Sequence, residues 1–129
     1  MVRHQILIAD DNFVNRRLVS TALSRSGYAV RETQDGRSTV ESCLQEKPDL
    51  AIIDIHMPEI DGLTVIRQLR QHYPNALLPI LVLTADVDLS PAQCLDAGAN
   101  DVIFKPLDLD EMRAKVRGLL DDPFAAISA

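Results

Sequence analysis

Short apolar runs alternate along the chain with segments in which apolar residues recur at helical spacing. The runs are rich in β-branched residues and bounded by turn residues, a pattern typical of strands buried on both faces of a sheet. They predict strands at residues 5–9, 28–32, 50–54, 79–85 and 101–104. The second run is more polar than the others, so we expect it to be the most exposed strand.

The segments between these runs predict helices. The first begins after Asn12 and stops before Gly27, a residue typical of helix ends. One of its faces carries apolar residues that we expect to pack against the sheet, namely Val14, Leu18 and Ala22. Its arginines are expected to face solvent, namely Arg16, Arg17 and Arg25.

Four more helices are expected, at about residues 37–45, 63–73, 91–97 and 109–119. Ser90 supplies a capping side chain for the third of these, and Pro91 supplies a favoured first helical residue. Asp108 caps the last helix. The apolar residues of that helix recur at helical spacing and are Leu109, Met112, Val116 and Leu119.

Alternating strands and helices without internal repeats predict an α/β fold, a doubly wound parallel sheet of five strands. The 129 residues suffice for one domain with a real core and are too few for two. We expect this domain at residues 1–120, with a C-terminal tail or the start of a linker at 121–129.

Composition narrows the function classes. With 47% hydrophobic and 25% charged residues, the chain has the composition of a globular domain. No apolar run approaches the roughly 20 residues of a membrane span, and no signal-peptide pattern opens the chain, so we expect a cytoplasmic domain without membrane contact. The net charge of −6 argues against nucleic-acid binding, which needs a basic face. Cys43 and Cys94 occur in half-apolar helical contexts and are interpreted as reduced packing residues.

Polar residues with available chemistry stand at the ends of four of the five predicted strands. In chain order they are Asp10 and Asp11, Asp54, Thr84, and Lys105. Parallel strands end at one edge of the sheet, and ligands bind at that edge in open α/β sheets, so these residues are expected to converge. Glu32 and Thr33 end the second strand and are not included in this set.

Three carboxylates in one cavity repel strongly. At ~4 Å and an effective dielectric constant of ~20, each pair costs about 4 kcal/mol. They stay ionised together only around a cation, and hard oxygen donors favour Mg²⁺ or Mn²⁺. Lys105 would add a positive charge and Thr84 a hydroxyl donor around a transferring phosphoryl group. Asp54 is then the candidate nucleophile and would form an aspartyl phosphate.

As a set, these motifs resemble the response-regulator receiver domain, the phosphoacceptor module of bacterial two-component signalling and of chemotaxis regulators. The motifs occur in the family's order and are Asp10-Asp11, Asp54 with Met57-Pro58, Asp61-Gly62, Thr84-Ala85 and Lys105-Pro106. The resemblance implies a flavodoxin-like sheet with strand order 2-1-3-4-5. It also implies a signalling module that is not an enzyme, a Mg²⁺ cofactor, and a cis peptide before Pro106.

The resemblance assigns roles to the residues around the expected metal. Asp54 resembles the phosphorylated aspartate and a metal ligand, Asp11 resembles the direct Mg²⁺ ligand, and Asp10 resembles its water-mediated neighbour. His56 stands where the family uses a backbone carbonyl on the metal, so its imidazole need not bind the ion.

Two further residues would act on the phosphoryl group. Lys105 resembles the lysine that pairs with it, and Thr84 resembles the switch hydroxyl that moves toward it. The family often has an aromatic residue three positions before the lysine, which rotates with the threonine, and here that position is Val102. We expect the switch to act on a protein partner through the face formed by the helix at 91–97, the strand at 101–104 and the last helix.

Two segments resemble receivers fused to hybrid sensor kinases, namely Asp10-Asp11-Asn12-x-x-Asn15-Arg16 and residues 94–101. We therefore expect a domain of a hybrid kinase phosphorelay. Its partner would be a histidine kinase domain or a histidine phosphotransfer domain that carries the phosphohistidine. Any tether to the inner membrane would then come from the parent sensor kinase.

Other interpretations stay open on the residues alone. One is a stand-alone, single-domain response regulator. Another is a Mg²⁺-dependent aspartyl-phosphate hydrolase, which needs an acid two residues after its nucleophile, where this chain has His56. A flavodoxin-like cofactor binder would need a phosphate-binding loop after the first strand, where Asp10 and Asp11 repel phosphate. Each motif alone also has a structural explanation, such as a helix cap for Asp10-Asp11-Asn12.

Overall fold

The computed structural model describes residues 3–121 of the chain. Within them five strands alternate with five helices. The strands are β1 (Gln5–Ala9), β2 (Ala29–Thr33), β3 (Leu50–Asp54), β4 (Ile80–Thr84) and β5 (Asp101–Phe104). The helices are α1 (Phe13–Arg25), α2 (Gly36–Gln45), α3 (Gly62–Arg70), α4 (Pro91–Ala97) and α5 (Leu109–Asp121). Every predicted element is present, with bounds that differ by at most a few residues.

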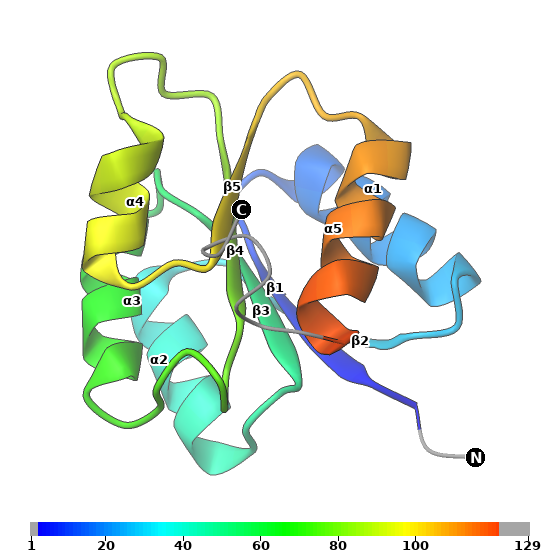
Figure 1. Ribbon diagram of the computed structural model, residues 1–129, viewed down its shortest axis with the longest axis horizontal. Helices are drawn as coiled ribbons and strands as arrows, with labels where there is room; N and C mark the ends of the chain where they lie inside the picture. Colours follow the sequence, from blue (N-terminus) through cyan, green and yellow to red (C-terminus); the bar gives the residue numbers. More distant parts are fainter. Residues whose placement is uncertain (1–2, 122–129) are drawn as a thin grey trace.

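The strands form one parallel sheet in the order β2-β1-β3-β4-β5. The predicted doubly wound, flavodoxin-like fold and its strand order are therefore confirmed. Helices α1 and α5 cover one face of the sheet, and α2, α3 and α4 cover the other (Figure 1). Because the strands are parallel, their carboxyl ends share one edge, where the loops leaving β4 and β5 lie at the top of Figure 1.

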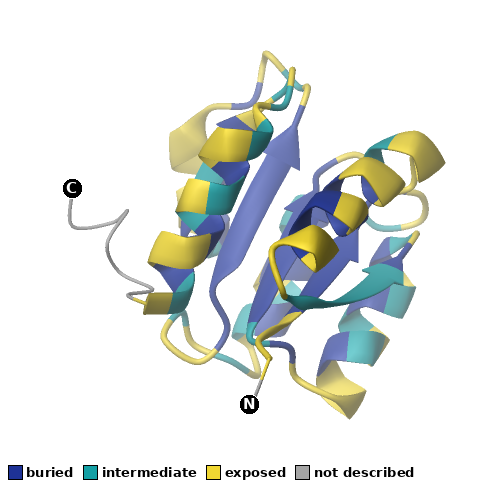
Figure 2. Ribbon diagram, turned by 90° about the vertical axis from the view of Figure 1, so that its right-hand side faces the viewer, coloured by how far each residue is buried: buried dark blue, intermediate teal, exposed yellow. Residues whose placement is uncertain are grey.

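The core consists of two layers, one on each face of the sheet. Neighbouring residues of a strand alternate between them: Ile6 and Ile8 pack under α1 and α5, whereas Leu7 packs on the opposite face. All five residues of β3 and of β4 are buried, which explains their unbroken apolar sequence. Strand β2 lies at an edge and is only half-buried, as its polar sequence predicts (Figure 2).

Helix α1 faces the sheet differently from the prediction. Val14 is 71% exposed and Leu18 is 47% exposed, so the predicted buried face is wrong for both, although Ala22 is buried. Val19 and Leu23 fill that place instead. Arg16, expected in solvent, is only 7% exposed. It turns inward because Glu32 on β2 accepts a hydrogen bond from its guanidinium.

The helix ends follow the predicted capping chemistry. Ser90 and Gln93 form a reciprocal capping box at the start of α4, with Pro91 in the first turn. Asp108 accepts a hydrogen bond from the N–H of Glu111 at the start of α5. The residues of α5 that pack on the sheet are, as predicted, Met112, Val116 and Leu119.

Helix α5 ends at Asp121, so the predicted tail lies, apart from that residue, outside the described part of the chain. The boundary at residue 120 accordingly stays a prediction. No helix among residues 3–121 combines the length and the apolar character that a bilayer crossing requires.

Both cysteines are buried and unpaired, as the packing interpretation predicts. Burial raises the pKa of the Cys43 thiol to about 11. Burial also raises the pKa of Cys94, and the nearby charge of Asp86 adds to the shift. Both groups therefore act as small apolar side chains rather than as nucleophiles.

We expect both cysteines of the folded protein to react slowly with iodoacetamide at pH 9.0, the pKa of an ordinary thiol. At that pH, Cys43 has roughly 50-fold less thiolate than an exposed cysteine, and both sulfur atoms are shielded. Intact mass after timed labelling measures the rate. The same reaction in urea is the control and should run to completion, and fast double labelling without urea would show that the thiols are accessible.

Candidate functional site

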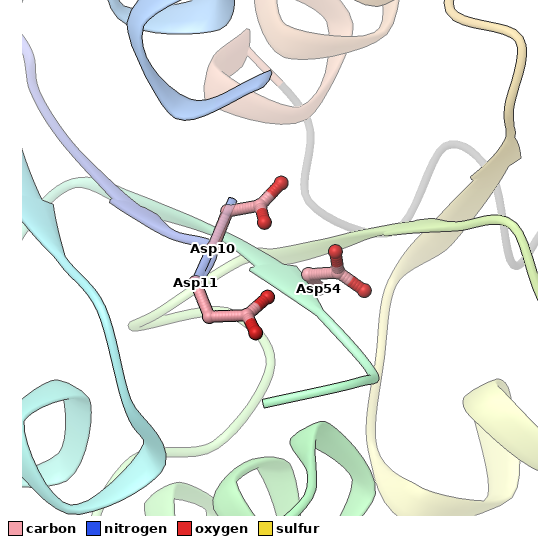
Figure 3. A group of neighbouring side chains, drawn as sticks. All are labelled: Asp10, Asp11 and Asp54. Carbon is pink, nitrogen blue, oxygen red and sulfur yellow. The ribbon is translucent and has the colours of Figure 1, made fainter. Parts of the chain in front are cut away.

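Three carboxylates meet at the carboxyl edge of the sheet. Asp10 and Asp11 follow β1, and Asp54 is the last residue of the adjacent strand β3. Each offers one oxygen such that all three oxygens lie within 4.8 Å of one another. Asp10 and Asp54 are buried and Asp11 is exposed. Figure 3 shows the three side chains near one another at the ends of the two strands.

Lys105 reaches this cluster from the end of β5. Its Nζ lies 3.1 Å from Oδ2 of Asp54 and 3.5 Å from Oδ2 of Asp10. Burial lowers the pKa of Lys105, but the attraction of Asp54 and Asp10 outweighs burial, and the net shift is upward. For Asp10, burial raises the pKa of the carboxyl group. The hydrogen bond from the N–H of Asn12 lowers this pKa and the charge of Asp54 raises it, and the net shift is upward.

Backbone donors fix the directions of the two buried carboxylates. The N–H of Asn12 donates to Oδ1 of Asp10 at 2.9 Å, and the N–H of His56 donates to Oδ1 of Asp54 at 3.1 Å. The His56 side chain is largely exposed, and its Nε2 lies 3.1 Å from Oδ2 of Asp86. Its ring is therefore engaged outside the acidic cluster, which suits the expectation that only its backbone carbonyl takes part.

Thr84 ends β4 at the same edge and is fully buried. Its Oγ1 accepts a hydrogen bond from the N–H of Asp86 at 3.1 Å, and its carbonyl accepts one from the N–H of Lys105 at 2.8 Å. The Thr84 hydroxyl is therefore hydrogen-bonded to the loop that follows β4. Val102 is partly buried against the core layer beneath α4. The Lys105–Pro106 peptide is cis, as the resemblance suggested.

The Asp61-Gly62 motif lets α3 begin directly beneath Asp54. The N–H of Gly62 donates to the carbonyl of Ile55 at 2.7 Å. A Cβ at position 62 would lie 2.7 Å from the Cα of Ile55 and would collide with the carbonyl oxygen of Asp54. Only glycine allows this close approach, so the motif positions the backbone that carries Asp54.

Sequence reasoning missed the contribution of β2 to the site. Thr33 accepts a hydrogen bond from the N–H of Asp10 at 3.2 Å, and Glu32 pairs with Arg16, which in turn donates to the Asp10 carbonyl. No local pattern marks this contribution. The one available signal is that β2, like the other strands, ends in residues able to bind polar groups.

The donor set fits a hard divalent cation. It consists of carboxylate oxygens, with neither a thiolate nor an imidazole among them, which favours Mg²⁺ or Mn²⁺ over softer metals. Lys105 supplies one positive charge against three carboxylates. The cluster therefore keeps an excess of negative charge, which such an ion would balance. An Asp54 oxygen beside both a cation and an ammonium group is suited to accept a phosphoryl group.

A family model described as "Response regulator receiver domain" matches residues 6–117. Response regulator MprA from Mycolicibacterium vanbaalenii is 43% identical over 117 residues, which cover 90% of this chain and 50% of that protein. The DNA-binding dual master transcriptional regulator RpaA from Synechocystis is 40% identical over 117 residues, covering 90% of this chain and 48% of that protein. The chain spans about half the length of these curated relatives.

A solved structure extends the comparison to the site. The receiver domain of the sensor histidine kinase PA1611 from Pseudomonas aeruginosa is 29% identical, with a TM-score of 0.85. The match covers 94% of this chain and 100% of that one. That crystal structure has a magnesium ion coordinated in its active site cleft.

Gly62→Ala should lower the free energy of unfolding by about 1–3 kcal/mol, because the added methyl group forces α3 away from the Asp54 backbone. Gly118→Ala is the matched control. It lies in α5 with nothing within 4 Å of the added Cβ, so it should raise stability by about 0.5–1 kcal/mol. Urea denaturation measures both. Equal effects of the two substitutions would contradict the close approach at position 62.

Asp11→Asn should weaken Mg²⁺ binding by at least ~10-fold, because it removes the exposed charged donor of the cluster. Calorimetric titration of the unphosphorylated protein with MgCl₂ measures the affinity. Asp96→Asn, which neutralises an exposed carboxylate on α4, is the matched control and should bind as wild type does. An unchanged affinity in Asp11→Asn would remove Asp11 from the metal site.

Proposed function

The chain belongs to the response regulator receiver domain family, and from this premise we propose that Asp54 accepts a phosphoryl group from a phosphohistidine on a partner protein. A receiver domain is a phosphoacceptor signalling module rather than an enzyme. One observation carries the proposal for this chain: Asp54 lies within 4.8 Å of two further carboxylates and 3.1 Å from the Lys105 ammonium group.

The transfer is an in-line displacement at phosphorus. An oxygen of the Asp54 carboxylate bonds to phosphorus while the phosphorus–nitrogen bond to the donor imidazole breaks, and the freed nitrogen takes a proton from solvent. Lys105 neutralises the charge on the phosphoryl oxygens. The N–H of His56 holds the second Asp54 oxygen in place, which presents the first to the donor.

We propose that Asp10, Asp11 and Asp54, with the His56 carbonyl, hold Mg²⁺. The magnesium ion in the kinase receiver of Pseudomonas aeruginosa supports this assignment by analogy. When bound, Mg²⁺ would offset the repulsion among the carboxylates and the phosphoryl oxygens. Asp11, the exposed acid, is the proposed direct ligand, and Asp10, closer to Lys105 and buried, acts through water.

The donor protein would approach beside α1. A groove of about 260 Å³ opens there, and its lining includes Asp10, Leu18 and Lys105. Phe13 and Val14 at the start of α1 are exposed apolar residues, 65% and 71% respectively. A helical histidine kinase or histidine phosphotransfer domain that covers these residues would bring its phosphohistidine to the edge where Asp54 lies.

Phosphorylation would then change the balance between two conformations of the proposed partner face. The Thr84 hydroxyl would exchange its bond with the N–H of Asp86 for one with the phosphoryl group, drawing in the loop after β4. The proposed partner face comprises α4, β5 and α5, where Lys115 pairs with Asp101 at 2.7 Å. Val102, in place of an aromatic residue, packs against the core, so the loop and α4 carry most of the movement.

The curated relatives support a response regulator more than a hybrid kinase as the wider context. They are 40% and 43% identical and are named as regulators, whereas the kinase receiver is 29% identical. Neither relative is named as a kinase. We accordingly propose a cytoplasmic response regulator whose receiver spans residues 1–120. The name of RpaA describes it as DNA-binding. We do not propose DNA binding for this domain, because the chain has a net charge of −6.

The chain does not have the acid that the alternative function, a phosphate hydrolase, requires two residues after its nucleophile. Two residues after Asp54 stands His56, whose ring lies against Asp86 rather than over the Asp54 carboxylate. Without a group that activates water, the acyl phosphate would persist, which suits a signal and not a turnover enzyme.

Incubation with MgCl₂ and acetyl phosphate should add the mass of one phosphoryl group to the intact protein, and Asp54→Asn should abolish the addition. The asparagine lacks the nucleophilic carboxylate. Asp96→Asn controls for the loss of a carboxylate elsewhere and should be phosphorylated as wild type is. An adduct that survives in Asp54→Asn, or sustained turnover of p-nitrophenyl phosphate by wild type, would refute the proposed role.

A further inference from the structure

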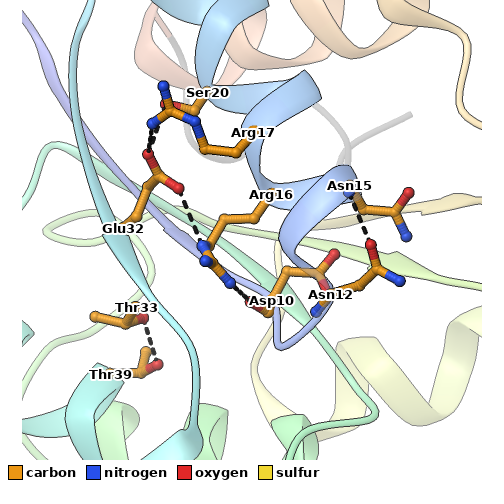
Figure 4. A network of polar contacts seen from close by, with 9 residues as sticks. All are labelled: Asp10, Asn12, Asn15, Arg16, Arg17, Ser20, Glu32, Thr33 and Thr39. Atoms are coloured by element: carbon orange, nitrogen blue, oxygen red, sulfur yellow. Dashed lines mark hydrogen bonds and ion pairs between the residues drawn. The ribbon is translucent and has the colours of Figure 1, made fainter.

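Arg16 is a buried cation that contacts the backbone of the acidic cluster. It lies on α1, is 7% exposed, and points toward the sheet. Its Nη1 donates to the carbonyl oxygen of Asp10 at 2.8 Å, and its Nε donates to Oε1 of Glu32 at 3.0 Å (Figure 4). One planar guanidinium therefore connects the end of β1 with the end of β2.

Glu32 anchors this guanidinium. Its Oε2 accepts hydrogen bonds from Arg17 at 2.6 Å and from Ser20 at 3.1 Å, while its Oε1 serves Arg16. Figure 4 shows these α1 side chains converging on the single carboxylate. Arg16 is thus held in one orientation, because its partner Glu32 is itself fixed by the hydrogen bonds from Arg17 and Ser20.

The N–H of Asp10 is held by the same strand. It donates to the carbonyl of Thr33 at 3.2 Å, and the Thr33 hydroxyl is hydrogen-bonded to that of Thr39 at 2.8 Å. Both polar groups of the Asp10 backbone are therefore tied to the end of β2, directly through Thr33 and indirectly through Arg16 and Glu32.

The carbonyl that Arg16 holds belongs to the peptide joining Asp10 to Asp11. The orientation of this peptide decides the directions in which both carboxylates leave the chain. These two groups repel each other and Asp54, so an unrestrained peptide would turn to separate them. A donor on the far side of the peptide opposes that rotation without occupying the space where the carboxylates meet.

We propose that Arg16 is a positioning residue for the divalent cation site, and that Glu32 acts through it. The inference rests on the proposed metal site and adds the residues that keep its acids converged. The Arg16 guanidinium bonds to the Asp10 carbonyl and to Glu32, so its effect on the site would pass through the Asp10–Asp11 peptide. Groups that orient metal ligands in this way typically change metal affinity by about 10–100-fold when removed.

The test compares Mg²⁺ affinity with thermal stability in four proteins: wild type, Arg16→Met, the double variant Arg16→Met with Glu32→Leu, and Arg17→Met. The double variant also removes the carboxylate that anchors Arg16, so it tests whether Glu32 acts on the site only through Arg16. Arg17→Met is the matched control, because Arg17 also pairs with Glu32 but is half-exposed and has no contact with Asp10.

Calorimetric titration with MgCl₂ should show a loss of about 10–100-fold in both proteins that lack Arg16, and wild-type affinity in Arg17→Met. The double variant should bind Mg²⁺ no more weakly than Arg16→Met, whatever its thermal stability, because Glu32 reaches the site through Arg16. A purely structural role for Arg16 would instead make affinity follow stability. Wild-type Mg²⁺ affinity in the folded double variant would overturn the inference.

Phosphorylation separates this inference from the proposed function. If wild type binds Mg²⁺ and is phosphorylated on Asp54 while the proteins lacking Arg16 bind equally well, only the positioning role fails. If wild type itself does not bind Mg²⁺, the proposed metal site fails, and the positioning role fails with it.

Discussion

Like-charged carboxylates held within 4.8 Å of one another are the constraint on which the rest of the site depends. Ionised groups so close repel by several kcal/mol unless positive charge and oriented donors surround them. The protein supplies the Lys105 ammonium group and the backbone N–H groups of Asn12 and His56. The remaining negative charge suits a divalent cation, and in the proposed function that cation would allow a dianionic phosphoryl group to approach Asp54.

The sheet topology makes this arrangement possible. Adjacent parallel strands β1 and β3 end at one edge, so acids more than forty residues apart meet without any long loop between them. The same edge receives Lys105 from β5, and Gly62 lets α3 begin against the backbone of Asp54. Strand β2 then supports the cluster from behind through Thr33 and Arg16. The site is therefore built on the ends of strands that pack between the two core layers.

The features that depend on local sequence pattern could be predicted, whereas those that depend on a partner distant in the sequence could not. Strands β3 and β4 are unbroken apolar runs, and Asp54 and Thr84 end them, so both the fold and the converging set could be inferred. The orientation of α1 could not, because the buried Arg16 bonds to Glu32, sixteen residues away on another strand, and to the Asp10 carbonyl. In this orientation Val19 and Leu23 pack on the sheet, and Val14 and Leu18 are exposed, against the helical spacing that favoured their burial. The motif that suggested a hybrid kinase includes Arg16, whose contacts with Asp10 and Glu32 lie within this domain.

Anomalous scattering from crystals grown with Mn²⁺ tests the central claim most directly. The account predicts one strong peak at the carboxyl edge of the sheet, within direct coordination distance of Asp11 and Asp54, about 2.1 Å for an ion of this kind. Lys105 should remain beside Asp54. A peak at another place, or an empty cluster at saturating Mn²⁺, would contradict the account.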